Sequence, residues 1–333
     1  MKKITTFLLS SLLVCISCIG LVGCKKDPGK IRLTETTHSV FYAPLYAAIN
    51  LGFMEEEGIS IELTNSGGSD AGMASLLSGN ADIALLGPEP VVYAVAGGST
   101  SSPVVFGQLT KKDGTFLVSK TPINNFNWAT SLVNKKVIAG RAGGVPAMTF
   151  EWVVNQVNLF NNTNITLDTS TAFNMMVPVF DSPENDADFC TMFEPTASEY
   201  VSLGKGHIIA SVGEQSGDIP YTCFIAKPSF LNKNKDLAKG FLRAVKKGYD
   251  YLMTHTDAEG AEAIYPSFKT TSKTLLASSI ASYKSIDAWM ATPAMSVSSY
   301  NRLLDVLINA GTIDSRIAFD KVVDNTLAYS FDE

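Results

Sequence analysis

The fold of this chain is decided by residues 34–63, which read TETTHSVFYAPLYAAINLGFMEEEGISIEL. Phe41, Leu45 and Ile49 recur at four-residue intervals, which predicts a helix with one apolar face. Apolar and polar residues then alternate over 59–63, as they do in a strand. A strand, a helix and a second strand in this order predict a parallel pair joined by a right-handed crossover.

The first strand of this unit, predicted over residues 31–36, ends in a polar loop that carries Thr37 and His38. Ligands of open α/β sheets bind at the carboxyl ends of strands, so this loop is expected to face a ligand. A histidine there can donate or accept a hydrogen bond or stack on a flat ring; the alternative is a loop histidine bonded to backbone. Of the neighbouring Phe41 and Tyr42, one is expected to line the ligand and the other to pack in the core.

Length and composition indicate a globular protein of two domains. The chain has 333 residues, of which 46% are hydrophobic and 17% are charged. These values suit packed cores and not a disordered chain. The formal charge of −6, with no basic stripe in the sequence, argues against a nucleic-acid partner.

Residues 1–23 read as an export signal, in which Lys2 and Lys3 precede an apolar run. The LVGC that ends it resembles the bacterial lipobox, which implies that Cys24 becomes the lipidated first residue of the mature protein. Acyl chains on Cys24 would hold the exported protein on the outer face of the cell membrane, with residues 24–30 as a tether. Without Lys2 and Lys3, 24 basic and 32 acidic residues remain, a formal charge of −8.

Two cysteines remain in the mature chain besides the lipidated one, Cys190 and Cys223. Two are too few for a disulfide framework. We expect both to be buried free thiols, with a single bridge as the alternative.

Strand and helix patterns alternate along most of the chain, and the last third is helical, with a final helix predicted over residues 319–329. Alternation of this kind predicts an α/β protein. The expected architecture has two α/β lobes joined by two chain crossings. Lobe one comprises residues 30–112 and 223–333, and lobe two is the insertion 113–222.

Each lobe carries a glycine-containing loop between a strand and a helix. In lobe one the loop contains Ser66, Gly67, Gly68, Ser69 and Asp70, and in lobe two it contains Arg141, Ala142, Gly143 and Gly144. Free backbone amides at a helix start favour an anion or a carbonyl oxygen of a ligand. The alternative is an ordinary capped turn.

Two Glu-Pro pairs follow predicted strand ends, one in each lobe. Glu89 comes shortly after Gly87, and Glu194 lies in the insertion. A carboxylate in a closed cleft is costly unless it is paired or bonded to donors, so two of them would suit a ligand rich in N–H groups. Alternatively, Glu194 caps a helix or pairs with a lysine. Tyr221, near the second crossing, is a candidate lid or hinge aromatic.

The sequence offers little support for an enzyme. His38, His207 and His255 are scattered, so no metal cluster and no histidine-paired nucleophile is predicted. We therefore expect neither a catalytic residue nor a cofactor nor a bound metal.

Five stretches resemble solute-binding proteins of the NMT1/THI5-like and SsuA-like group. They are HSVFYAPLYAAINLGFMEEEGISIEL, LLSGNADIALLGPEP, KKVIAGRAGG, ADFCTMFEPTASEYVSLGKG and DVLINAGTID, and they come in the family's order. The resemblance covers nearly all of residues 31–331. It implies a type II periplasmic-binding-protein fold, a ligand between the two lobes and an ABC importer that receives it.

The expected function is capture of a small solute by lobe closure, by a monomer that serves ABC permease and ATPase subunits. Glu89, Glu194 and His38 favour a nitrogen heterocycle such as a thiamine-precursor-like pyrimidine. Arg141 and the helix starts favour the alternative, an anion of the alkanesulfonate, taurine or nitrate type. Two further alternatives are a THI5-like pyrimidine-synthesising enzyme, against which the export signal argues, and a sensor lipoprotein that presents its ligand to a receptor.

Overall fold

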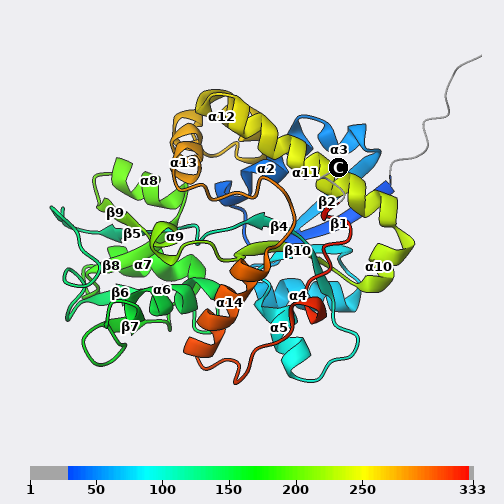
Figure 1. Ribbon diagram of the computed structural model, residues 1–333. Coiled ribbons are helices and arrows are strands. Elements are labelled where there is room, and N and C mark those ends of the chain that lie inside the picture. The colour runs from blue at the N-terminus through cyan, green and yellow to red at the C-terminus, as the bar shows by residue number, and fades with distance from the viewer. Residues whose placement is uncertain (1–28, 330–333) are drawn as a thin grey trace, which may run out of the picture.

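The computed structural model describes residues 29–329 of the chain. The predicted signal segment 1–23, the lipidation site Cys24 and tether residues 24–28 lie outside the described residues. Two five-stranded sheets dominate the structure, and Figure 1 shows them side by side. Within the described part, no helix is both long and apolar enough to cross a bilayer.

Sheet one has the strand order β2-β1-β3-β10-β4. Its strands are β1 (Gly29–Glu35), β2 (Ile59–Asn65), β3 (Ile83–Leu86), β4 (Val104–Thr110) and β10 (Thr222–Ala226). β1 pairs in parallel with β2, Ile31 opposite Ile61, and also with β3. The parallel pair predicted from residues 34–63 is therefore confirmed. β10 comes from the part of the chain that follows the insertion, and it runs antiparallel to both β3 and β4.

Sheet two has the order β7-β6-β8-β5-β9. Its strands are β5 (Thr115–Ser119), β6 (Lys136–Ile138), β7 (Thr166–Asp168), β8 (Phe189–Phe193) and β9 (His207–Ser211). β6 is parallel to β7 and to β8, while β5 runs antiparallel to β8 and β9. The sequence patterns did not predict β5 as a strand, although it lies inside this sheet.

Helices follow the strands of both sheets. Those connected with sheet one before the insertion are η1 (Val40–Tyr42), α2 (Ala43–Asn50), α3 (Phe53–Glu56), α4 (Ser69–Ser78) and α5 (Glu89–Ala96). Those of the insertion are α6 (Val145–Asn155), η2 (Phe173–Met175), α7 (Met176–Asp181), α8 (Thr196–Ser202) and α9 (Val212–Ser216). The later ones are α10 (Pro228–Lys233), α11 (Lys235–Thr254), α12 (Asp257–Ile264), η3 (Tyr265–Ser267), α13 (Lys273–Ser285), α14 (Val297–Asn309) and η4 (Phe319–Lys321).

The α/β architecture with two lobes follows from how the chain is distributed between the sheets. The strands of sheet one fall within residues 29–110 and 222–226, and those of sheet two within 115–211. The chain passes between the sheets once after β4 and once before β10. The lobe limits 30–112, 113–222 and 223–333 are compatible with this division, and the boundary residues themselves stay a prediction.

The prediction of a helix over residues 319–329 is wrong. Only the short 3-10 helix η4 forms there, and the next residues run beside β4. Val105 N donates to Val322 O at 2.9 Å, and Asp324 N donates to Val105 O at 2.8 Å. Val105 and Val323 form a parallel bridge. The apolar residues in this segment therefore cover a sheet edge, so their spacing does not reflect a helix face.

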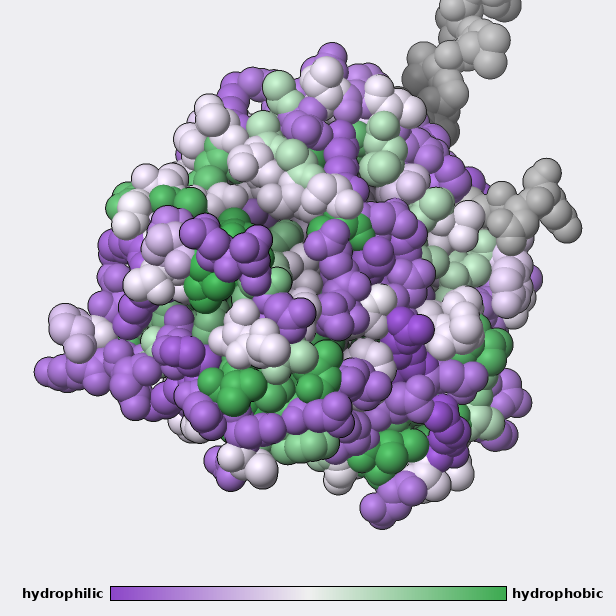
Figure 2. All heavy atoms as spheres, turned by 60° about the vertical axis from the view of Figure 1, so that its left-hand side comes forward, coloured by the Kyte–Doolittle hydropathy of each residue, from purple (hydrophilic) through white to green (hydrophobic). Residues whose placement is uncertain are grey.

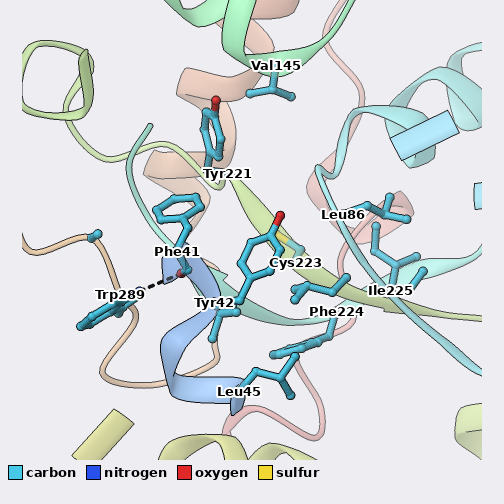
Figure 3. Close-up of a cluster of buried hydrophobic side chains, with 14 of the residues drawn as sticks. Phe41, Tyr42, Leu45, Leu86, Val145, Tyr221, Cys223, Phe224, Ile225 and Trp289 are labelled. Atoms are coloured by element: carbon cyan, nitrogen blue, oxygen red, sulfur yellow. Dashed lines mark hydrogen bonds between the residues drawn. The ribbon is translucent and has the colours of Figure 1, made fainter. Parts of the chain in front are cut away.

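The lobe-one core is centred on the segment that follows β1 (Figure 3). Phe41 and Trp289 are both almost completely buried, and Trp289 Nε1 donates to Phe41 O at 2.9 Å. α11 packs closely on α2 because Gly248 has no side chain: a Cβ there would lie 2.0 Å from Pro44 O. This packing fixes the start of α2, and with it the loop that follows β1.

The two remaining cysteines are buried free thiols, as predicted. Cys190 lies in β8 of sheet two and Cys223 in β10 of sheet one. Burial raises the pKa of both thiols well above the ordinary value, so they behave as small apolar side chains.

Candidate ligand-binding cleft

A cavity of about 110 Å³ lies between the two sheets. It is bordered by the carboxyl ends of the parallel strands β1, β2 and β3 from one sheet and β6, β7 and β8 from the other, with the start of β10 alongside. Its lining residues are Thr36, Thr37, Tyr42, Gly67, Gly68, Ser69, Gly87, Glu89, Arg141, Gly144, Val145, Pro146, Phe173, Phe193, Tyr221 and Thr222. Strand ends of two sheets are thus brought to one cavity.

Most of the residues predicted from the sequence as ligand contacts meet in this lining. They are Thr37, Tyr42, Gly67, Ser69, Gly87, Glu89, Arg141 and Tyr221. The structure does not place four others there, namely His38, Ser66, Gly143 and Glu194. Contact of any of them with a ligand stays a prediction.

Glu89 brings a buried carboxyl to the cleft. It is the first residue of α5, directly after β3, and is only 3% exposed. Its Oε2 has no hydrogen-bond partner among residues 29–329. Burial raises the pKa of Glu89 to about 7, while the hydroxyl of Ser69 acts in the opposite direction. The carboxyl group folds back over Gly87, where a Cβ would lie 2.0 Å from Oε2.

Arg141 and Asp70 form an ion pair across the two lobes. Asp70 lies in the first turn of α4 beside sheet one, whereas Arg141 follows β6 of sheet two. Arg141 Nη2 donates to Asp70 Oδ2 at 2.9 Å. Both side chains are more than half exposed, so solvent screens the attraction and the pair contributes little to stability.

Aromatic rings form much of the remaining lining. Tyr221 packs edge-to-face on Phe41, with ring centroids 5.7 Å apart, and Phe173 packs on Phe193 at the same separation. In Figure 3 the Tyr221 hydroxyl points toward Val145 of α6. That hydroxyl is buried, makes no hydrogen bond of normal geometry within the described chain, and interacts with the buried Asp113 carboxyl. Flat faces and buried polar groups together suit a flat ligand that carries polar atoms.

Tyr221 also lies beside the crossing between the lobes, where Asp113 is completely buried. Burial, and then the charge of Asp113, raise the pKa of the Tyr221 phenol. Asp113 Oδ1 accepts from Thr115 N at 2.7 Å, while its Oδ2 has no partner in the described part of the chain. Burial raises the pKa of Asp113 to about 7.

His38 faces the C-terminal helical region and is absent from the lining. Its Nδ1 lies 2.8 Å from Glu35 Oε1, and its Nε2 lies 2.8 Å from Ser267 O. The ring stacks on Phe268 at 4.4 Å between centroids. The hydrogen bond to Glu35 raises the pKa of His38. The alternative stated for this residue, a loop histidine bonded to backbone, therefore describes its surroundings.

Glu194 is also held by protein groups. Its Oε2 accepts from Ser198 N at 3.0 Å, so it satisfies an amide in the first turn of α8. Its Oε1 accepts from Ser198 Oγ at 2.7 Å and from Ser282 Oγ of α13 at 3.0 Å. The capping alternative matches this arrangement, because the carboxylate has bonded donors on both oxygens.

The last two predicted residues outside the lining have local structural roles. Ser66 Oγ donates to Glu35 O at 2.9 Å and to Gly68 O at 3.1 Å, which holds the turn after β2. Gly143 has a φ of +74°, a conformation that favours glycine, and its neighbour Gly144 lines the cleft instead.

Eight lining residues were not singled out as ligand contacts from the sequence: Thr36, Gly68, Gly144, Val145, Pro146, Phe173, Phe193 and Thr222. Thr36, Gly68 and Gly144 belong to the loops that were expected to face the ligand. Only the structure indicates a binding role for Phe173: its side chain is large and apolar, yet it is 44% exposed. Phe193 is the last residue of β8. Its position next to the predicted residue Glu194 was the only feature of the sequence that indicated a place in the cleft lining.

A family model described as NMT1/THI5 like matches residues 40–259. The chain belongs to the NMT1/THI5-like family. One relative, the protein YtlA of Bacillus subtilis (strain 168), is named as a candidate binding protein. YtlA is 34% identical to this NMT1/THI5-like chain over 321 residues, which cover 94% of this chain and 95% of YtlA.

Solved structures share the fold of this NMT1/THI5-like protein. The periplasmic aliphatic sulphonate binding protein SsuA from Escherichia coli matches with a TM-score of 0.70 and 14% identity, covering 91% of this chain and 99% of SsuA. The desulfurization enzyme DSZB matches with a TM-score of 0.61 and 12% identity, covering 91% and 99%. At these identities the likeness shows a periplasmic-binding-protein fold, and the fold occurs in both a binding protein and an enzyme.

Proposed function

We propose that this NMT1/THI5-like protein is the solute-binding lipoprotein of an ABC importer and captures a small nitrogen heterocycle that carries N–H groups. The observation that carries the proposal is the buried Glu89 carboxyl, whose Oε2 has no partner among residues 29–329 in a cleft that also holds aromatic rings from both lobes. A buried polar atom without a partner is costly, and a ligand donor removes that cost.

The chemistry of the cleft favours a flat ligand with hydrogen-bond donors. An aminopyrimidine of the thiamine-precursor kind offers a ring nitrogen beside an exocyclic amino group, and a carboxyl group can pair with both atoms at once. With its pKa at about 7, Glu89 can hold or give up the shared proton near neutral pH. Tyr42 and Tyr221 supply ring faces, and Phe173 and Phe193 supply apolar contact from the other lobe.

The rival ligand is a small anion of the alkanesulfonate, taurine or nitrate type. Arg141 in the lining and the start of α4 at Gly67–Ser69 support it, and the fold is shared with a sulphonate-binding protein. The pairing of Arg141 with Asp70 weighs against it, because an anion must compete with a carboxylate already in place.

Capture follows from the arrangement of the two lobes. The lining comes from loops of both sheets, so a ligand makes its full set of contacts only when the lobes are together. A ligand that binds one state better shifts the population toward that state. The closed form then docks on the permease, while acyl chains on Cys24 keep the exported protein on the outer face of the membrane.

A thermal-shift screen of the purified mature protein tests the ligand class. Aminopyrimidines should raise the melting temperature, because binding to the folded state stabilises it by mass action. Ethanesulfonate, taurine and nitrate serve as the rival set. Stabilisation by these anions alone would contradict the heterocycle, and turnover of any ligand by the protein would contradict a binding protein.

The lipid anchor and the importer need separate experiments. Cys24→Ala should abolish acylation of the exported protein, which labelling with a fatty acid measures. Uptake of the identified ligand should require the wild-type protein together with permease and ATPase subunits. Uptake that does not depend on the protein would favour the ligand-presenting sensor.

A further inference from the structure

The cleft contains a cationic side chain that is already paired. Within residues 29–329, Arg141 is the only lysine or arginine in the cleft lining. Its Nη2 donates to Asp70 Oδ2 at 2.9 Å. Asp70 itself is absent from the lining, so it engages the guanidinium from outside the cavity.

We propose that Asp70 is a selectivity residue that keeps small anions out of the cleft by holding the Arg141 guanidinium. The inference rests on the proposed function, since it assumes that a solute binds in this cavity. The new element is the Asp70 carboxylate as the group that rejects small anions, the competing class of ligand. Selectivity of this kind works by making the wrong ligand unfavourable, in addition to fitting the right one.

The neighbourhood of Arg141 would otherwise suit an anion. Gly67, Gly68 and Ser69 line the cleft at the start of α4, a helix of ten residues whose positive dipole end lies there. Backbone amides at a helix start and a guanidinium are both good partners for a sulfonate or phosphate. Occupation of Arg141 by Asp70 removes the guanidinium from this set.

A second carboxyl makes the same space less favourable for anions. Glu89 is 3% exposed, lines the cleft, and has an oxygen with no partner in the described chain. Both charges act on Glu89: burial is the main cause that raises its pKa, the charge of Asp70 raises the pKa further, and the charge of Arg141 lowers it. An anion entering the cleft would have to displace Asp70 and remain close to it, which exchanges one ion pair for another and adds repulsion.

Removal of the Asp70 charge tests this role. Ethanesulfonate is titrated calorimetrically into the mature protein in low salt, for the wild type, Asp70→Asn and Asp70→Ala. Asparagine removes the charge and keeps the shape, whereas alanine also removes the acceptor. Both variants should bind ethanesulfonate about threefold to fivefold more tightly than the wild type, because the anion no longer has to break an exposed, solvent-screened ion pair to reach Arg141. Asp70 is 72% exposed, so the folded state should persist, which circular dichroism checks.

Two controls separate this role from a general charge effect. Asp236→Asn makes the same change of charge in the first turn of α11, outside the lining, and should leave ethanesulfonate binding at the wild-type level. Arg141→Met in the Asp70→Asn background should abolish the gain. A gain that survives without Arg141, or that also appears in Asp236→Asn, would overturn the inference.

The outcomes also distinguish the inference from the proposed function. If neither Asp70 variant gains ethanesulfonate binding while aminopyrimidines still stabilise the wild type, the inference fails and the proposed function stands. If the wild type binds ethanesulfonate as tightly as the Asp70 variants, Asp70 excludes nothing. If both variants gain binding through Arg141 although no heterocycle binds the wild type, the inference holds and the proposed ligand class fails.

Discussion

Glu89 and Glu194 occupy equivalent places in the two lobes. Each follows a strand, each precedes a proline and each is buried, with 3% and 1% of its surface exposed. Their hydrogen bonds are opposite in character: Glu194 accepts three bonds from Ser198 and Ser282, whereas Glu89 keeps an oxygen with no partner among residues 29–329. The same local pattern thus yields a structural cap in one lobe and an unsatisfied carboxyl at a cleft in the other.

The neighbours of each carboxyl explain the difference. Ser198 lies in the first turn of α8 and Ser282 comes from α13, so donors reach Glu194 from two helices. Beyond Pro90, the first turn of α5 continues with Val91 and Val92, whose side chains bring no donor to Glu89. A buried carboxyl at a strand end is therefore a ligand candidate only where the surrounding fold leaves one of its oxygens without a donor.

The largest expected effect is on the pH dependence of stability. The pKa of Glu89 is about 7 in the folded protein against an ordinary 4.5. Between these values the folded state holds a proton that the unfolded state has lost, so this group lowers the free energy of unfolding as pH rises from about 4.5 to about 7. Glu89→Gln should therefore gain up to about 3 kcal/mol relative to the wild type between pH 4 and pH 8.

Urea unfolding at a series of pH values measures this gain. Asp113→Asn is the matched comparison, because burial also raises the pKa of that carboxyl to about 7. A difference between Glu89→Gln and the wild type that stays constant over the pH range would show that Glu89 titrates normally.

The second effect is on ligand affinity. Glu89→Leu should weaken binding of the heterocycle by roughly tenfold to a hundredfold, because both hydrogen bonds between the carboxyl and the ligand are lost. Isothermal titration at pH 6, below the Glu89 pKa of about 7, gives the comparison. Glu194→Gln should bind with nearly wild-type affinity, and equal losses in the two variants would remove the distinction between the two carboxyls.

The third effect concerns Glu194 as a structural group. Glu194→Ala should lower the free energy of unfolding by about 2 kcal/mol, because Ser198 N loses its capping acceptor and a buried site loses its hydrogen bonds. Ser198→Ala removes the hydroxyl donor but keeps the backbone bond, so its loss should be smaller. Urea denaturation of both variants checks the order, and a neutral Glu194→Ala would argue against the cap.

The smallest effect belongs to His38, the third group expected at the ligand. Its pKa is raised above 6.5 by the hydrogen bond to Glu35, so its stabilising effect is full below pH 6.5 and fades as the pH rises through the raised pKa. His38→Gln should cost about 1 kcal/mol at pH 6 after discounting for solvent screening, and less at pH 9. Thermal unfolding at both pH values measures the difference; a larger loss at pH 9 would contradict it.

The strands and loops that border the cleft could be predicted from the sequence because the relevant patterns are local. The parallel pairing of β1 and β2 follows from apolar spacing within residues 34–63. Gly67, Ser69, Gly87 and Glu89 were identified because they stand where parallel strands end, and strand ends share one edge of a sheet. Short-range periodicity and turn residues are sufficient for inferences of this kind.

The tertiary structure decided which strand-end groups meet and which are already bonded. Glu194 lies 88 residues from its partner Ser282, and His38 lies 229 residues from Ser267. Phe173 entered the lining as the first residue of η2, and the segment after η4 packed along β4 instead of forming a helix. A side chain's hydrogen-bond partners come from whatever the fold brings beside it, so local spacing determines where a carboxyl sits but not whether it is free to bind a ligand.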